Sequence, residues 1–138
     1  MSFATTAAEM KSFDARAFIE DLVERDTAAA LSRCTDELTW VVPGTPRYGG
    51  GTHRGKNQVL AFLNRVIELF PRGLCVEALV AWPGPAGAVV EATLVGDTAR
   101  GLRYRNRYAF VLAVHDGCVV EIREYTDTAY AEAVLAGC

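Results

Sequence analysis

The sequence has few of the side chains from which metal and redox sites are built. Its 138 residues include only four cysteines and two histidines. No two cysteines form a C-x-x-C pair, their spacings match no zinc pattern, and His53 and His115 lie far apart in the chain. The sequence therefore supports no metal site. The cysteines are interpreted as scattered small hydrophobic residues in a reducing cytosol.

Basic residues are also fewer than acidic residues. Fourteen Lys and Arg residues face seventeen Asp and Glu residues, so the formal net charge is -3. Such a chain has no overall field that attracts phosphates, which argues against nucleic acid as a partner. The arginines at 103, 105 and 107 are interpreted as part of a solvated or dimer-facing sheet surface.

A long uninterrupted apolar run is missing as well. The longest apolar region, Leu74 to Val95, is broken by two glutamates and two prolines, so it cannot span a membrane. The segment Met1 to Met10 has neither the basic nor the continuous apolar part of a secretory signal. We therefore expect a cytoplasmic protein with no membrane partner.

Apolar residues are plentiful. They make up 51% of the chain and charged residues 22%, which excludes intrinsic disorder. The length fits one compact domain, so residues 1–138 are assigned to a single domain with a substantial core.

Periodicity and capping residues predict a sequence of helices followed by strands. The predicted helices are 8–25, 27–33, 56–70 and 128–135, with Asp26 and Asp127 as N-caps of the two short ones. The predicted strands are 38–42, 74–82, 88–95, 103–114 and 118–126, with a possible short strand near His53 in the loop 43–55. The last four strands form an antiparallel meander, and the fold class is α+β.

The hairpin formed by the last two strands contains most of the candidate functional residues. A two-residue turn at Asp116-Gly117 would mix buried and charged residues on both faces. A three-residue turn that starts at His115, with Gly117 in a left-handed bulge, segregates them and is preferred. It pairs Val114 with Cys118 and places Glu124 opposite Tyr108. The inner face then holds even-numbered residues of both strands: Tyr104, Asn106, Tyr108, Phe110, Leu112, Val120, Ile122 and Glu124.

Glu124 is the anomaly on this inner face, because it is a carboxylate among apolar and aromatic residues. A buried carboxylate needs hydrogen-bond partners, a raised pKa, or both. Tyr108, Asn106 and Tyr104 can supply the hydrogen bonds, and Glu91 on the neighbouring strand offers a second carboxylate. Glu124 is interpreted as a general acid or base. A structural carboxylate bonded to Tyr108 or to an arginine is the alternative.

Two groups of motifs resemble those of SnoaL-like proteins. The first is Trp40-Val-Val-Pro-Gly44 with His53-Arg-Gly55 and the helix that follows. The second is Gly101-Leu-Arg-Tyr104-Arg-Asn106-Arg-Tyr108-Ala-Phe110, followed by Ile122-Arg-Glu124-Tyr-Thr-Asp127. The resemblance runs from about Phe13 to Tyr130, almost the whole chain.

The resemblance implies a cone-shaped α+β barrel. In it a curved, mostly antiparallel sheet wraps around N-terminal helices and encloses a deep apolar pocket. Ketosteroid isomerase, limonene epoxide hydrolase, scytalone dehydratase and nuclear transport factor 2 are similar in fold. The resemblance further implies a homodimer that packs through the outer sheet face, and an enzyme without a cofactor that works by acid-base chemistry.

The catalytic residues of these relatives carry over only in part. The carboxylate base of ketosteroid isomerase corresponds to Val42, and its second acid falls near Ala109, so the steroid isomerase mechanism is disfavoured. One carboxylate of limonene epoxide hydrolase corresponds to Glu124 and its partner falls near Glu91. The arginine expected two residues before that partner is replaced by Val89.

These observations lead to one expected function and two alternatives. We expect a cofactor-independent isomerase or polyketide cyclase that acts on a small hydrophobic oxygenated compound. An epoxide hydrolase-like enzyme and a non-catalytic ligand-binding or dimeric interaction module are the alternatives. The expected catalytic residues are Glu124, Glu91, Tyr108 and Asn106. The expected substrate-binding residues, for which core packing is the competing interpretation, are Trp40, Tyr104, Phe110, Phe18 and Phe62.

Overall fold

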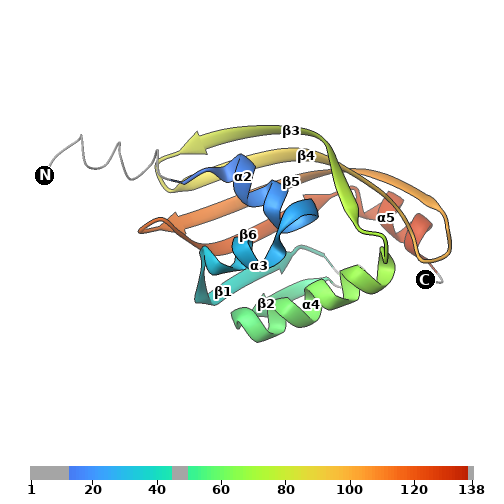
Figure 1. The fold of residues 1–138 in the computed structure, drawn as a ribbon, viewed down its shortest axis with the longest axis horizontal. Helices are drawn as coiled ribbons and strands as arrows, with labels where there is room; N and C mark the ends of the chain where they lie inside the picture. The colour runs from blue at the N-terminus through green and yellow to red at the C-terminus, as the bar shows by residue number, and fades with distance from the viewer. Residues whose placement is uncertain (1–12, 45–49, 137–138) are drawn as a thin grey trace, which may run out of the picture.

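The computed structural model describes residues 13–44 and 50–136 and has the α+β architecture expected from the sequence. In this described part of the chain, six strands form one sheet in the order β2-β1-β6-β5-β4-β3. The sheet is strongly curved and unclosed, and helices lie against its concave face (Figure 1). Within the described residues, no helix is both long enough and apolar enough to cross a membrane.

The described part of the N-terminal helical segment is less regular than predicted. Its described part consists of helix α2 (Ala15–Glu20), the π-helical turn η1 (Asp21–Arg25) and helix α3 (Thr27–Ser32). The predicted start at residue 8 lies outside the described residues. The wider π turn interrupts the α-helical pattern within the predicted helix 8–25, a change that apolar spacing alone does not reveal.

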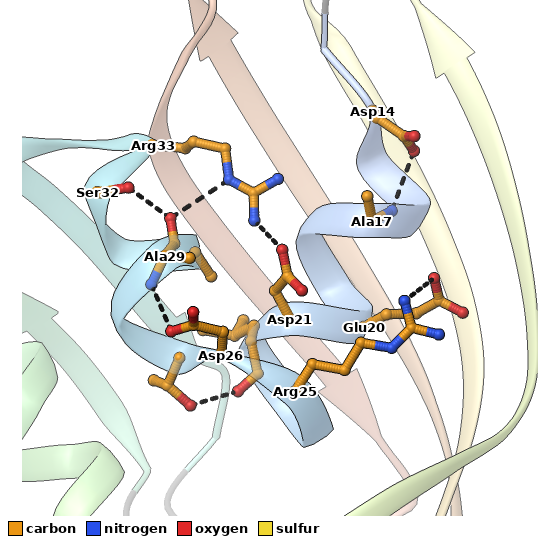
Figure 2. A network of polar contacts seen from close by, with 12 residues as sticks. Asp14, Ala17, Glu20, Asp21, Arg25, Asp26, Ala29, Ser32 and Arg33 are labelled. Carbon is orange, nitrogen blue, oxygen red and sulfur yellow. Dashed lines mark hydrogen bonds and ion pairs between the residues drawn. The ribbon is translucent and has the colours of Figure 1, made fainter.

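Polar contacts join these short helical pieces (Figure 2). Asp14 caps α2 by accepting a hydrogen bond from the backbone N–H of Ala17, and Asp26 caps α3 in the same way, as predicted. Arg33 pairs with Asp21 and its guanidinium lies 5.6 Å from the ring centre of Phe18. The two caps satisfy backbone N–H groups at the helix starts that would otherwise lack partners, and the Arg33–Asp21 pair links the end of α3 to the π turn.

The helix α4 (Gly55–Leu69) agrees with the prediction to within one residue at each end. The side chain of Gln58 accepts a hydrogen bond from the backbone N–H of Arg54, which closes the first turn. The helix packs on β1 (Cys34–Val42) and on the short strand β2 (Gly51–Arg54). Its buried face, with Val59 and Phe62, points at the core.

The antiparallel meander is confirmed. It consists of β3 (Leu74–Gly84), β4 (Gly87–Asp97), β5 (Arg103–His115) and β6 (Cys118–Thr126). The last strand then pairs in parallel with β1, which the sequence did not predict. Helix α5 (Thr128–Leu135) follows with the predicted bounds and the predicted cap at Asp127.

The turn between β5 and β6 differs from the prediction. Asp116 and Gly117 form a two-residue turn, both with positive φ, and His115 pairs with Cys118. A bulge then shifts the register between Ala113 and Val114, and Glu124 comes to lie opposite Phe110 rather than Tyr108. Asp-Gly suits a two-residue turn with positive φ at both positions, and the bulge restores the segregation of the two faces.

The even-numbered residues from Tyr104 to Leu112 on β5 and from Ile122 to Glu124 on β6 therefore share the inner face, as expected. The bulge, and not a three-residue turn, brings them together. Of the residues predicted on the inner face, Val120 is the one that the structure places elsewhere. Val119 is fully buried in its place, because the bulge reverses the alternation at that end of β6. The main core lies between this face and the helices α2, α3 and α4.

Candidate active site

A cavity of about 150 Å³ lies between the concave face of the sheet and the helices. Most of its wall is apolar, with Phe62, Val66 and Phe70 from the α4 region and Leu94 and Phe110 from the sheet. A dry apolar cavity of this size can hold a ligand as large as benzene. The cavity is therefore suited to part or all of a small hydrophobic molecule.

Glu124 is the one acidic residue among the described residues that line this cavity. It is 8% exposed, and one carboxyl oxygen, Oε1, accepts a hydrogen bond from the indole nitrogen of Trp40 at 3.1 Å. Burial raises the pKa of Glu124 from its usual 4.5 to about 7, although the hydrogen bond from Trp40 acts in the opposite direction. A carboxyl group with such a pKa can both accept and donate a proton near neutral pH.

A pair of tyrosines contributes hydroxyl groups to the same cavity. Tyr104 and Tyr108 both line it, and their hydroxyl oxygens are 2.6 Å apart. The side-chain amide of Asn106 donates to the hydroxyl of Tyr104 at 2.9 Å and to the backbone carbonyl of Asp127 at 3.0 Å. Burial raises the pKa of Tyr104, so this hydroxyl stays protonated and can donate a hydrogen bond.

The mouth of the cavity lies between α4 and the N-terminal helical segment. On one side Leu63 is half-buried and Ile67 is 61% exposed; on the other, Val23 is half-buried and Thr27 is exposed. The π turn therefore forms part of the rim. The mouth is mostly apolar and presents no charged side chain among the described lining residues.

Glu91 does not lie in this cavity. It is exposed on the outer face of the sheet and accepts a hydrogen bond from the indole nitrogen of Trp82 at 2.9 Å. Its neighbours Val90 and Ala92 are buried, because β4 alternates regularly at this point and pairs with β5 without a bulge. The structure thus corrects the expected pairing of Glu91 with Glu124 in one pocket.

The structure separates the other predicted residues into two groups. Trp40, Tyr104, Tyr108, Phe110 and Phe62 line the cavity together with Glu124. Asn106 is buried behind Tyr104 and reaches the cavity only through that hydroxyl.

Phe18 is not among the lining residues either. It is fully buried in the core beside Phe13, at 5.7 Å between ring centres. This position agrees with core packing, the competing interpretation of this residue.

Sequence reasoning missed several contributors to the site. The rim residues Val23 and Thr27 belong to a segment that was predicted as regular helices. The bond between Trp40 and Glu124 joins residues 84 positions apart, across the parallel β1–β6 pair. His53 stacks on Phe62, with ring centres 4.4 Å apart. The structure pairs His53 with Trp40 across β1 and β2, and the possible short strand near His53 was the only hint of this contact in the sequence.

Residues 13–44 and 50–136 hold no group of three or more His, Cys, Asp or Glu side chains placed to bind a metal ion. The three described cysteines, Cys34, Cys75 and Cys118, are free. Burial raises the pKa of Cys34 to about 11, so this thiol is a packed hydrophobic group rather than a nucleophile.

Solved structures share this fold across nearly the whole chain. A phenazine biosynthesis-related protein of Pseudomonas aeruginosa superimposes with a TM-score of 0.79 at 15% identity, covering 98% of this chain and 92% of the other. TerC, crystallised with polyporic acid, gives 0.73 at 23% identity, covering 96% of each chain. An NTF2-like protein of Burkholderia pseudomallei gives 0.68 at 23% identity, covering 99% and 100%.

These similarities establish the NTF2-like cone fold. A search of curated protein sequences found no match to the chain. A family model does match, however, over residues 15–122, which include helices α2, α3 and α4, most of the sheet, and the cavity-lining residues other than Glu124 and Leu135. The chain therefore belongs to the SnoaL-like domain family.

Proposed function

We propose that the protein is a cofactor-independent enzyme that moves a proton on a small, neutral, hydrophobic carbonyl compound, in an isomerisation or cyclisation. The observation that carries the proposal is the buried carboxyl of Glu124, which lines an apolar cavity together with the hydroxyl groups of Tyr104 and Tyr108. A pKa of about 7 gives this group comparable fractions of base and acid at neutral pH. The SnoaL-like family, which includes isomerases and cyclases, is consistent with this chemistry.

The proposed step needs two groups on the protein. The ionised carboxylate of Glu124 removes a proton from the carbon next to the carbonyl, and the electron pair moves onto the carbonyl oxygen. The hydroxyl pair of Tyr104 and Tyr108 stabilises the oxyanion by hydrogen bonding. Glu124 then returns the proton to a second carbon, or the enolate carbon attacks a second carbonyl within the same molecule and Glu124 protonates the new alkoxide.

The character of the cavity argues for a neutral substrate. The described lining residues include no Lys, Arg or His to balance a negative charge. An anionic group placed there would be desolvated without a partner, at a cost of several kcal/mol. Epoxide opening by a carboxylate pair has less support, because Glu91 lies on the outer face of the sheet.

Hydrogen–deuterium exchange tests the proposal without a known substrate. A panel of neutral cyclic ketones and enones is incubated with the protein in D₂O, and NMR follows the loss of the hydrogen next to the carbonyl. We expect exchange with a pH midpoint near 7 on at least one compound. Glu124→Gln removes the proton acceptor, so we expect a loss of about 100-fold or more.

Two further variants make this experiment specific. Glu121→Gln serves as the matched control, because Glu121 lies on the same strand but not in the cavity, and exchange should stay unchanged. Retention of exchange in Glu124→Gln would overturn the proposal. An equal loss in Glu91→Gln would instead favour a reaction that uses two carboxylates.

A further inference from the structure

The two oxygens of Glu124 have different surroundings. Oε1 accepts the hydrogen bond from Trp40, and the two side chains are 8% and 3% exposed. Among the described residues, no side chain or backbone group bonds to Oε2. A carboxyl group this deeply buried with one oxygen left without a protein partner is an arrangement that a ligand can complete.

We infer that Trp40 is a positioning residue that holds Oε1 of Glu124 and leaves Oε2 as the oxygen that exchanges protons with the substrate. This inference rests on the proposed function, because it names the reacting atom of that same site. Trp40 itself transfers no proton. Its indole N–H is a donor only, so it makes Oε1 an acceptor in both protonation states and directs the acidic proton to Oε2.

The packing around Trp40 holds the indole in place. Trp40 lies on β1, paired with His53 of β2 on one side and with Ile122 of β6 on the other. Its ring is tilted against that of Phe62, with centres 5.4 Å apart. Phe62 is in turn stacked on His53. An indole fixed on two sides donates its hydrogen bond with little loss of conformational entropy.

The charged and titratable groups that face this bond are few. Tyr104 and Tyr108 from β5 line the same cavity. His53 of β2 pairs with Trp40 and stacks on Phe62, and the guanidinium of Arg65 from α4 lies 5.9 Å from the centre of that ring. The described cavity-lining residues of η1, α3, β1, β3, β4, α4 and α5 include no charged side chain. Trp40 is therefore the main polar group of the protein that favours the ionised form of Glu124 over the protonated form.

The outer face of the sheet offers a natural comparison. Trp82 donates its indole N–H to Oε1 of Glu91 at 2.9 Å, so the same two side-chain types are bonded in the same way. Trp82 is 57% exposed, however, and water competes for both partners. Trp82→Phe is thus a matched control that removes an indole–carboxylate bond without touching the cavity.

The test replaces the indole N–H while keeping the shape of the ring. Benzothienylalanine, in which sulfur stands where the indole has N–H, is incorporated at position 40 in a Trp82→Phe background. NMR of carbon-13-labelled glutamate then gives the pKa of Glu124. A charge-assisted hydrogen bond favours the ionised form, so we expect its loss to raise that pKa by about one pH unit.

The exchange reaction supplies a second readout. A pKa higher by one unit lowers the ionised fraction at pH 7 by about fivefold. We expect exchange at pH 7 to fall by the same factor and to recover at pH 9, a pattern that a merely damaged fold does not produce. Trp40→Phe should shift the pH profile in the same direction, with an added loss of packing against Phe62.

The outcomes separate this inference from the proposed function. An unchanged Glu124 pKa in the folded benzothienylalanine protein would overturn the role of Trp40, even if Glu124→Gln abolishes exchange. Exchange that survives in Glu124→Gln would overturn the proposed function, while the pKa measurement would still report on the Trp40 bond. A shift of the Glu124 pKa in Trp82→Phe alone would also count against the inference.

Discussion

At the scale of single residues, Glu124 links burial to pH. Its carboxyl has a pKa of about 7 in the folded protein and 4.5 as an ordinary glutamate. The folded state therefore binds this proton more tightly than the unfolded state does. The stabilisation that results from this proton is fully present below pH 4.5. That contribution is lost as the pH rises through 7, and it amounts to about 3 kcal/mol.

Glu124→Gln should reveal this loss. Glutamine cannot ionise, so the variant does not lose this stabilisation as the pH rises. Its free energy of unfolding, relative to that of the native protein, should increase by about 3 kcal/mol between pH 4.5 and pH 8. Urea unfolding of both proteins at the two pH values measures the change. Glu121→Gln is the control and should show no comparable pH dependence. A difference between Glu124→Gln and the native protein that stays constant with pH would contradict the burial argument.

At the scale of elements, the β3–β4 hairpin depends on one glycine. Gly87 has φ of 152°, and a Cβ atom there would lie 1.8 Å from the backbone oxygen of Leu112 on β5. No real structure tolerates that distance, so a side chain at this position must push the two strands apart. Because Leu112 lies two residues from Phe110, such a displacement would also reach the cavity wall.

Gly87→Ala should therefore lower the free energy of unfolding by more than about 2 kcal/mol. Gly84, across the same hairpin, has nothing within 4 Å of the position that a Cβ atom would occupy, so Gly84→Ala is the matched control. It should change stability by less than about 0.5 kcal/mol. Denaturant unfolding compares the two, and equal effects would show that the close approach at Leu112 is unimportant.

At the scale of the whole molecule, the outer sheet face carries exposed apolar side chains. Val80, Trp82, Val89 and Tyr125 are 50%, 57%, 36% and 40% exposed. The first three are neighbours in the β3–β4 register. A cluster of this kind is typical of an interaction surface. The resemblance to SnoaL-like proteins implies a homodimer through this face, and we keep that as a prediction.

Sedimentation velocity tests the predicted dimer. The native protein should sediment with twice the mass of the chain, and Trp82→Lys should shift it to the monomer, because a lysine at the centre of an apolar interface would be buried without a partner. Leu102→Lys changes an apolar side chain of similar exposure, 45%, outside this face and should leave the mass unchanged. A native protein that sediments as a monomer would refute the prediction.

Much of this architecture could be predicted from local patterns. Helix α4 and the meander follow apolar spacings of 3.6 and 2 residues, and Asp26 and Asp127 cap their helices as short-range hydrogen bonding requires. The alternation of the buried residues Ile122 and Glu124 with the exposed Arg123 along β6 is likewise local. These features depend on neighbours within a few residues, so the sequence alone determines them.

Only the tertiary structure decided which carboxylate lines the cavity and which side chain holds it. The bulge on β6, the regular pairing of β4 and the parallel contact between β1 and β6 depend on chain segments far apart in sequence. Together they place Glu91 outside, Glu124 opposite Phe110, and the indole of Trp40 on its carboxyl. Register and long-range packing minimise the free energy of the whole sheet, which no local pattern encodes.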